Sequence, residues 1–140
     1  MAISQAMATS FKAEILDEQH DLVADTLKIA LYTSSASLGA TTTAYSTTNE
    51  VANGNGYATG GVTLANKAVS TSGTTAYFDA DDPTWTSASF TARGALIYND
   101  TNGNKAVAVL DFGSNKTSSS GTFTIQFPVA DASNAIIRIA

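Results

Sequence analysis

The residue of this 140-residue sequence best suited to acid–base chemistry is its single histidine, His20. A Ser–His–Asp triad needs a histidine that is oriented by a carboxylate and lies beside a serine nucleophile. His20 lies in the polar run DEQHD, and no serine stands in the GxSxG motif of a nucleophile elbow. We therefore interpret His20 as a solvated or capping side chain rather than as a catalytic base.

Three neighbouring aspartates in the segment FDADDPTW, Asp79, Asp81 and Asp82, could bind calcium or act as general acid and base on a glycan. They precede Pro83 and lie between two strand patterns, where aspartates commonly form turns by accepting hydrogen bonds from nearby backbone amides. No second carboxylate cluster accompanies them. We favour the turn, and a glycan hydrolase that uses these acids is the weaker alternative.

An EF-hand-like spacing places oxygen-bearing side chains at positions 1, 3, 5 and 12 of a candidate calcium loop: Asp100, Asn102, Asn104 and Asp111. Lys105 occupies position 6, where that loop requires glycine, and strand patterns flank the segment. Asn102–Gly103 is instead a strong hairpin signal. The glycines of NGNG and GG lack the GK[ST] of a phosphate loop, and the chain has no cysteine. The sequence thus predicts no catalytic residue, no metal site, no cofactor and no enzyme.

The composition excludes several further classes of protein. Charged residues make up 14% of the chain, against roughly 25% in ordinary soluble domains, whereas the chain contains 20 Thr and 15 Ser. A net charge of −5 disfavours binding to nucleic acid. No apolar run reaches the ~18 residues of a membrane span, and residues 1–16 lack the pattern of a Sec signal peptide. We expect no nucleic-acid partner and no membrane partner.

The elements that would position these residues fall into one domain, 1–140, with a helical N-terminal segment (1–22) and a β domain (26–140). Four apolar residues at a spacing of four predict one helix within residues 3–20, ending around Asp17–Asp21: Ile3, Met7, Phe11 and Ile15. A shorter helix that begins at Phe11 and is capped by Ser10 or Thr9 is the alternative.

From Thr26 onward the apolar period changes to two, beginning with TLKIALYT. We expect one hairpin at Ser72–Gly73, where VTLANKAV turns into TTAYFDA, and another at Asn102–Gly103. We favour a place in the core for Trp85, and an interface anchor is the alternative. About seven strands at short spacing predict a mainly β fold, an antiparallel β-sandwich or barrel with one N-terminal α-helix.

A long Ser/Thr/Gly-rich excursion, residues 34–61, interrupts the strand pattern and is too long for an ordinary connection. It is either a surface loop or a contact arm. We expect the excursion and the N-terminal helix to be contact elements, with Phe11, Tyr45 and Tyr57 near subunit boundaries and a dimer or trimer as the working unit.

Several stretches of the chain together resemble small virion structural proteins of tailed bacteriophages: ALYTSSA (30–36), TTAY…EV (42–51) and ARGALIY (92–98). The resemblance extends over nearly all of the chain from Ser10 onward, and none of these stretches is a catalytic motif. It implies a non-enzymatic capsid or tail component of the virion, assembled in the host cytoplasm. We favour a capsid decoration (cement) protein whose partners are the major capsid protein and other copies of itself. A tail, connector or receptor-facing component is the alternative.

Overall fold

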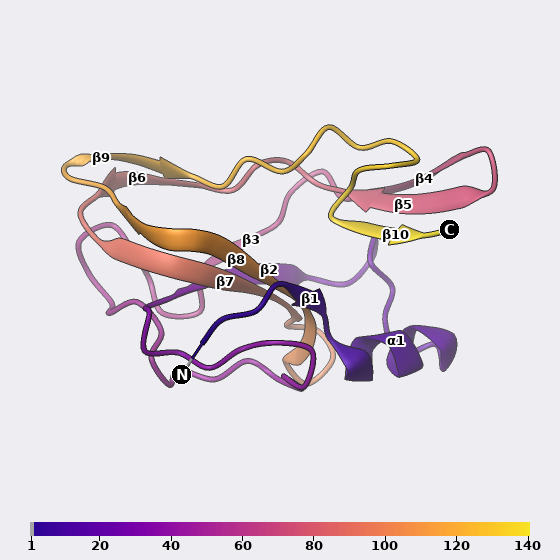
Figure 1. Cartoon of the computed structure of the whole chain (residues 1–140), viewed down its shortest axis with the longest axis horizontal. Coiled ribbons are helices and arrows are strands. Elements are labelled where there is room, and N and C mark those ends of the chain that lie inside the picture. Colours follow the sequence, from indigo (N-terminus) through magenta and orange to yellow (C-terminus); the bar gives the residue numbers. More distant parts are fainter. Residues whose placement is uncertain (1) are drawn as a thin grey trace.

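The computed structural model describes residues 2–140 and has the predicted fold class: it is mainly β, antiparallel and sandwich-like, with one helix (Figure 1). The elements in chain order are β1 (Ala6–Met7), α1 (Thr9–Leu16), β2 (Leu27–Tyr32), β3 (Val62–Thr63), β4 (Ala68–Ser72), β5 (Thr75–Asp79), β6 (Thr84–Ala88), β7 (Thr91–Asn99), β8 (Lys105–Thr117), β9 (Gly121–Thr124) and β10 (Ile137–Ile139). They form a five-stranded sheet in the order β1-β8-β7-β2-β3, a three-stranded sheet β10-β5-β4 and a two-stranded sheet β6-β9.

The five-stranded sheet lies in the middle of the molecule (Figure 1). The two smaller sheets lie above it in that view, and most of the excursion lies below it. Strand β2 shows the effect of this arrangement, because the side chains of both its faces are buried: Leu27, Ile29 and Leu31 on one, Ala30 and Tyr32 on the other. The core is therefore built on both faces of the central sheet.

Both predicted hairpins are present. Strands β7 and β8 are joined through residues 100–104, and Gly103 and Asn104 adopt the positive φ that the turn requires, 64° and 57°. Strands β4 and β5 are joined by a two-residue turn at Gly73–Thr74. The strand expected over VTLANKAV is interrupted, however: Asn66 has a φ of 53°, and the segment divides into β3 and β4.

The one helix lies within residues 3–20, as predicted, but it is shorter than the apolar spacing from Ile3 to Ile15 indicated. Residues 6 and 7 form β1 and pair with β8 opposite Val109 and Ala108, so the four-residue spacing there reflects strand pairing. The helix begins at Thr9, close to the shorter alternative, but its N-cap is Ala8, without a side-chain hydrogen bond. It ends at Leu16 with Asp17 as C-cap, where an end was expected.

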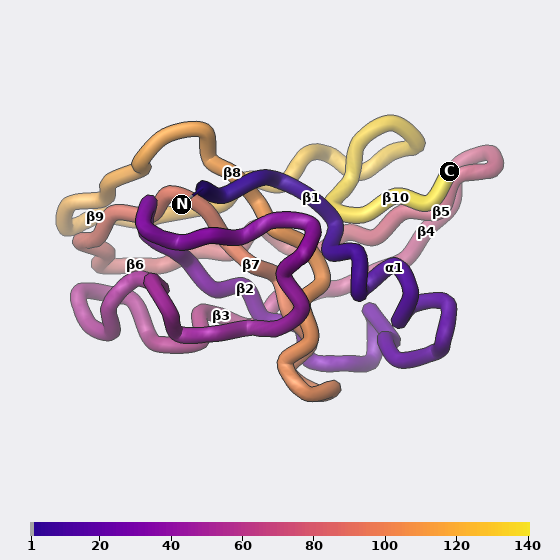
Figure 2. Tube along the Cα trace, turned by 60° about the horizontal axis from the view of Figure 1, so that its bottom comes forward, coloured from indigo at the N-terminus to yellow at the C-terminus, as the bar shows by residue number. Residues whose placement is uncertain are grey.

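The excursion is packed along its own chain. Its residues 37–41 run beside the N-terminal segment (Figure 2), with backbone hydrogen bonds from Ser4 to Leu38 and from Thr9 to Ala40. Further along, the excursion pairs with the outer edge of β2 beyond the end of β3, because the Leu31 carbonyl accepts from the Val51 amide. The excursion thus completes the sheet as well as covering it.

Candidate functional site

Two polar networks hold the segments that the sequence singled out. The first, here called the Glu50 cluster, comprises Glu50, Tyr45, Tyr57 and the amide of Gly60. Tyr45 donates to Glu50 Oε1 at 2.7 Å, while Tyr57 and the Gly60 amide donate to Oε2 at 2.5 and 2.7 Å. Three hydrogen bonds from the excursion itself therefore hold this half-buried carboxylate.

The Glu50 cluster is connected to the central sheet by further tyrosine contacts. The Tyr57 hydroxyl accepts from the backbone amide of Leu31 at 3.0 Å, and the Tyr98 hydroxyl donates to the Gly60 carbonyl at 2.6 Å. The Tyr45 and Tyr98 rings stack with centroids 4.5 Å apart. Burial raises the pKa of Tyr98 to about 12. Burial, followed by the hydrogen bond to Glu50, raises the pKa of Tyr57 above its ordinary value.

The Glu50 cluster determines which charges the excursion shows to solvent. Glu50 is the only Asp, Glu, Lys or Arg between residues 34 and 61. Since its carboxylate is bound within the cluster, the outward surface of the excursion consists of Ser, Thr, Asn, Ala and Gly with no free charge. This surface is here called the uncharged face. The side chains that hold it in place, Tyr45, Glu50 and Tyr57, lie beneath it.

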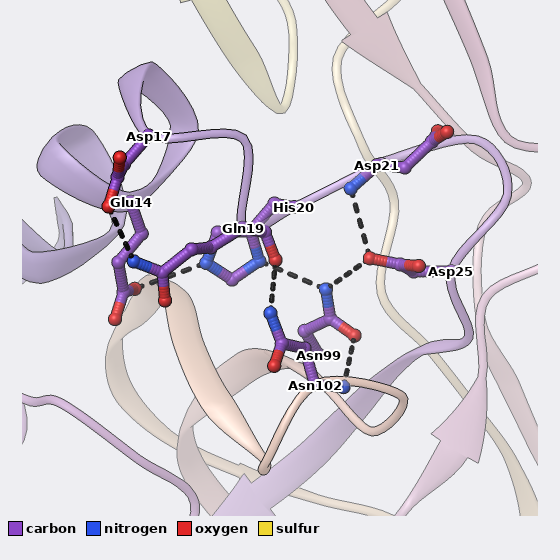
Figure 3. Close-up of polar contacts among 8 residues, drawn as sticks. All are labelled: Glu14, Asp17, Gln19, His20, Asp21, Asp25, Asn99 and Asn102. Carbon is purple, nitrogen blue, oxygen red and sulfur yellow. Dashed lines mark hydrogen bonds and ion pairs between the residues drawn. The ribbon is translucent and has the colours of Figure 1, made fainter.

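The second network, here called the His20 network, extends from α1 to β7 and comprises Glu14, His20, Asp25, Asn99 and Asn102 (Figure 3). His20 Nε2 lies 3.1 Å from Glu14 Oε1, and His20 Nδ1 lies 2.9 Å from Asn99 Nδ2. Because Asn99 Oδ1 accepts from the Asn102 amide and its Nδ2 also donates to Asp25, the amide nitrogen must face His20. The ring proton is therefore on Nε2 and is donated to Glu14.

The interpretation of His20 as a solvated or capping side chain is wrong. The residue is 7% exposed and its ring packs against Phe11 with centroids 4.9 Å apart. Both ring nitrogens are hydrogen-bonded, so in this arrangement His20 connects α1 to β7. The hydrogen bond from Asn99 also keeps the pKa of Asp25 below its usual value.

An apolar groove of about 480 Å³ adjoins the His20 network, between the loop after α1 and the sheet β10-β5-β4. Its inner wall includes the buried side chains of Phe11 and Phe78. Its rim carries exposed apolar side chains, Val23, Val69 and Ile139. This groove is an uncovered continuation of the core, and its lining also includes Glu18, His20 and Asp21.

The three residues expected near subunit boundaries lie at different depths. Phe11 and Tyr57 belong to the core, with exposed fractions of 1% and 3%, and Tyr45 is half-buried in the Glu50 cluster. Phe11 and Tyr57 therefore do not offer surface to a partner themselves. It stays a prediction that the helix and the excursion, which contain these residues, lie near subunit boundaries.

The candidate acids do not come together as a site. Asp82 accepts from the Phe127 amide at 2.9 Å, a residue distant in sequence and not a turn neighbour, whereas Asp81 binds Asn66 and Asp79 lies in β5. Asp111 pairs with Arg93. Among residues 2–140, no three His, Asp or Glu residues are grouped so that they could hold a metal ion.

Trp85 is buried in the core, as predicted, within an aromatic cluster that includes Tyr57 and Phe123 at centroid distances of 6.4 and 5.9 Å.

Sequence reasoning missed two organising residues, Glu50 and Asn99. The isolation of Glu50 in an otherwise uncharged segment was a usable signal. Asn99 carried none, because two of its partners, His20 and Asp25, lie more than 70 residues away in the chain.

Comparison with protein-family models, with curated proteins and with solved structures gave no match. In the part of the chain that the structure describes, the helical segments are too short or too polar to cross a bilayer.

Proposed function

We propose that this chain is a non-enzymatic virion structural protein of a tailed phage, a capsid decoration (cement) protein that binds the major capsid protein and other copies of itself. The observation that carries the proposal is the uncharged face. Fully buried parts of protein interfaces are depleted in charged residues, because ions lose their hydration on burial. A surface of hydroxyls and small side chains can be covered by a partner without that cost.

The way in which the excursion is held also supports binding by a preformed surface. The Glu50 cluster, the stacked Tyr45–Tyr98 pair and the pairing with β2 order the backbone before any partner arrives. A preordered surface loses less conformational entropy on binding than a mobile loop does. Repetition over a symmetric capsid lattice then makes many weak contacts act together.

The experiment uses phage particles that lack this protein and purified protein added back to them. We expect bound protein to restore the resistance of the head to heat and osmotic shock. Copy number distinguishes the alternatives, since hundreds of copies per virion indicate the head, whereas six, twelve or a few tens indicate the tail. A head that loses the protein without losing resistance would contradict the cement function.

Variants can test the uncharged face itself. Thr41 and Thr47 are exposed residues of the excursion without a side-chain hydrogen bond among residues 2–140, so Thr41→Lys and Thr47→Lys add charge without disturbing the Glu50 cluster. We expect each to weaken particle binding at least tenfold. The matched control is Thr122→Lys, in β9 on the other side of the central sheet (Figure 1). Equal binding by all three variants would show that the uncharged face is not the contact surface.

A further inference from the structure

Strand β4 is an open edge of the three-stranded sheet. It pairs with β5 on one side only, and all five of its residues are exposed. Its hairpin forms one end of the molecule in both views (Figures 1 and 2). An edge strand presents unpaired backbone N–H and C=O groups, to which another strand can add.

Two other edges in residues 2–140 are covered or protected. The excursion pairs with the outer edge of β2. The outer edge of β8 beyond β1 carries Asp111 and Lys116, and Gly113 there has a φ of 80°. Charges and irregular backbone are the usual protection of an edge against pairing. Residues 68–78, in contrast, contain neither a charge nor a proline.

An apolar row crosses the small sheet and stops at this edge. Ile137 lies opposite Phe78, and Phe78 lies opposite Val69, so the three side chains share one face. Ile137 and Phe78 are 5% and 2% exposed, whereas Val69 is 54% exposed. The apolar row is therefore buried at its β10 end and exposed to solvent at its β4 end.

We propose that the edge of β4 pairs with β4 of a second copy of this chain, antiparallel across a twofold axis perpendicular to the sheet. Such an axis keeps the two apolar rows on the same face of a continuous six-stranded sheet. A register centred on Ser70 places Val69 opposite Thr71 of the second copy. In this register Val69 of the second copy lies diagonal to Val69 on the same face, so symmetry brings the two apolar side chains together as neighbours.

The charges of the chain agree with a second copy as the occupant. Two molecules of net charge −5 repel one another overall. The uncharged stretch 68–78 lets them meet where no like charges face each other. The inference deepens the proposed function, because it names the surface through which copies associate, and it is tested in solution, where it can fail independently of particle binding.

Disulfide trapping tests the pairing directly, since the chain contains no cysteine of its own. We make Val69→Cys, Ser70→Cys and Thr71→Cys singly in the full-length chain, with Val129→Cys as the matched control at an exposed apolar residue outside β4. In the symmetric pair one β4 position opposes itself, and Cβ atoms of opposed residues lie about 4.5–5.5 Å apart. We expect one β4 variant to form covalent dimers at least tenfold faster than the control. Equal rates for all four would overturn the proposal.

Sedimentation of the cysteine-free chain gives the second measurement. We expect a concentration-dependent dimer that Val69→Lys and Thr71→Lys shift at least tenfold toward monomer, while Val129→Lys leaves it unchanged. Circular dichroism of each variant verifies folding. A monomer at the highest soluble concentration, or a dimer insensitive to both β4 variants, would overturn the proposal. Particle binding by a chain that forms no dimer in solution would contradict this inference alone. A dimer in solution that does not bind particles would contradict the proposed function alone.

Discussion

Replacing Tyr57 by Phe tests whether the Glu50 cluster holds the excursion on the sheet. The substitution removes one hydroxyl and keeps the buried ring. That hydroxyl donates to Glu50 at 2.5 Å and accepts from the Leu31 amide at 3.0 Å. Leu31 has no exposed surface, so water cannot replace the lost acceptor.

The expected cost follows from these two bonds. An orphaned buried amide costs about 1–3 kcal/mol, and a hydrogen bond to a charged group contributes about 1.5–3 kcal/mol. Glu50 keeps its bonds from Tyr45 and the Gly60 amide, which reduces the second loss. We therefore expect Tyr57→Phe to lower the free energy of unfolding by about 3 kcal/mol. For a chain of this length that corresponds to a fall in Tm of roughly 12 °C.

Urea unfolding followed by circular dichroism measures this change. The control is Tyr77→Phe, since the hydroxyl of this half-buried tyrosine has no hydrogen-bond partner among residues 2–140, and we expect a change within about 0.5 kcal/mol. Hydrogen exchange should show a selective loss of protection at the Leu31 amide. If Tyr57→Phe is no more destabilising than Tyr77→Phe, the reasoning about the Glu50 cluster is refuted.

The remaining predictions concern the His20 network, a close backbone approach and alkaline pH. Asn99→Ala removes bonds to three partners and should cost about 2–4 kcal/mol in urea unfolding; a cost no greater than that of the exposed Asn115→Ala would contradict it. Gly61→Ala places a Cβ 1.8 Å from the Ile29 carbonyl oxygen and should cost about 3 kcal/mol or more. Gly73→Ala, which has open space at a φ of 60°, should cost only about 1 kcal/mol. The folded state also retains phenolic protons that the unfolded chain releases near pH 10, so stability should hold up to about pH 10 and fall above it. Urea unfolding between pH 9 and 11.5 measures this, and a flat profile would contradict the raised pKa values of Tyr32, Tyr45, Tyr57 and Tyr98.

The sequence predicted those parts of the fold whose pattern is local. Period-two alternation identified β2, and Asn102–Gly103 identified the turn between β7 and β8. The N-terminal segment was misread because a spacing of four is shared by helical faces and by alternate positions of a strand. Only the pairing of Ala6 with Val109 decides between them, and that pairing depends on a distant strand.

The candidate site was less predictable, because its partners are far apart in the chain. The excursion has no apolar period, and its structure depends on the Glu50 carboxylate and on Tyr98 from β7. The burial of His20 likewise depends on Asn99, which lies 79 residues away. Local patterns do not carry information about such contacts. The sequence shows that Glu50 is the one charged residue of the excursion, but it does not show that the Glu50 carboxylate points inward.

The pairing of β1 with β8 also has a consequence for synthesis. Ala6 and Val109 are 103 positions apart, so a ribosome adding about 5–20 residues per second completes the second roughly 5–20 seconds after the first. Throughout that interval the N-terminal segment lacks the strand on which it rests, and Phe11 is without most of its core. Until then the nascent chain exposes apolar side chains that the folded protein buries. All five strands of the central sheet are present only after β8 has been synthesised.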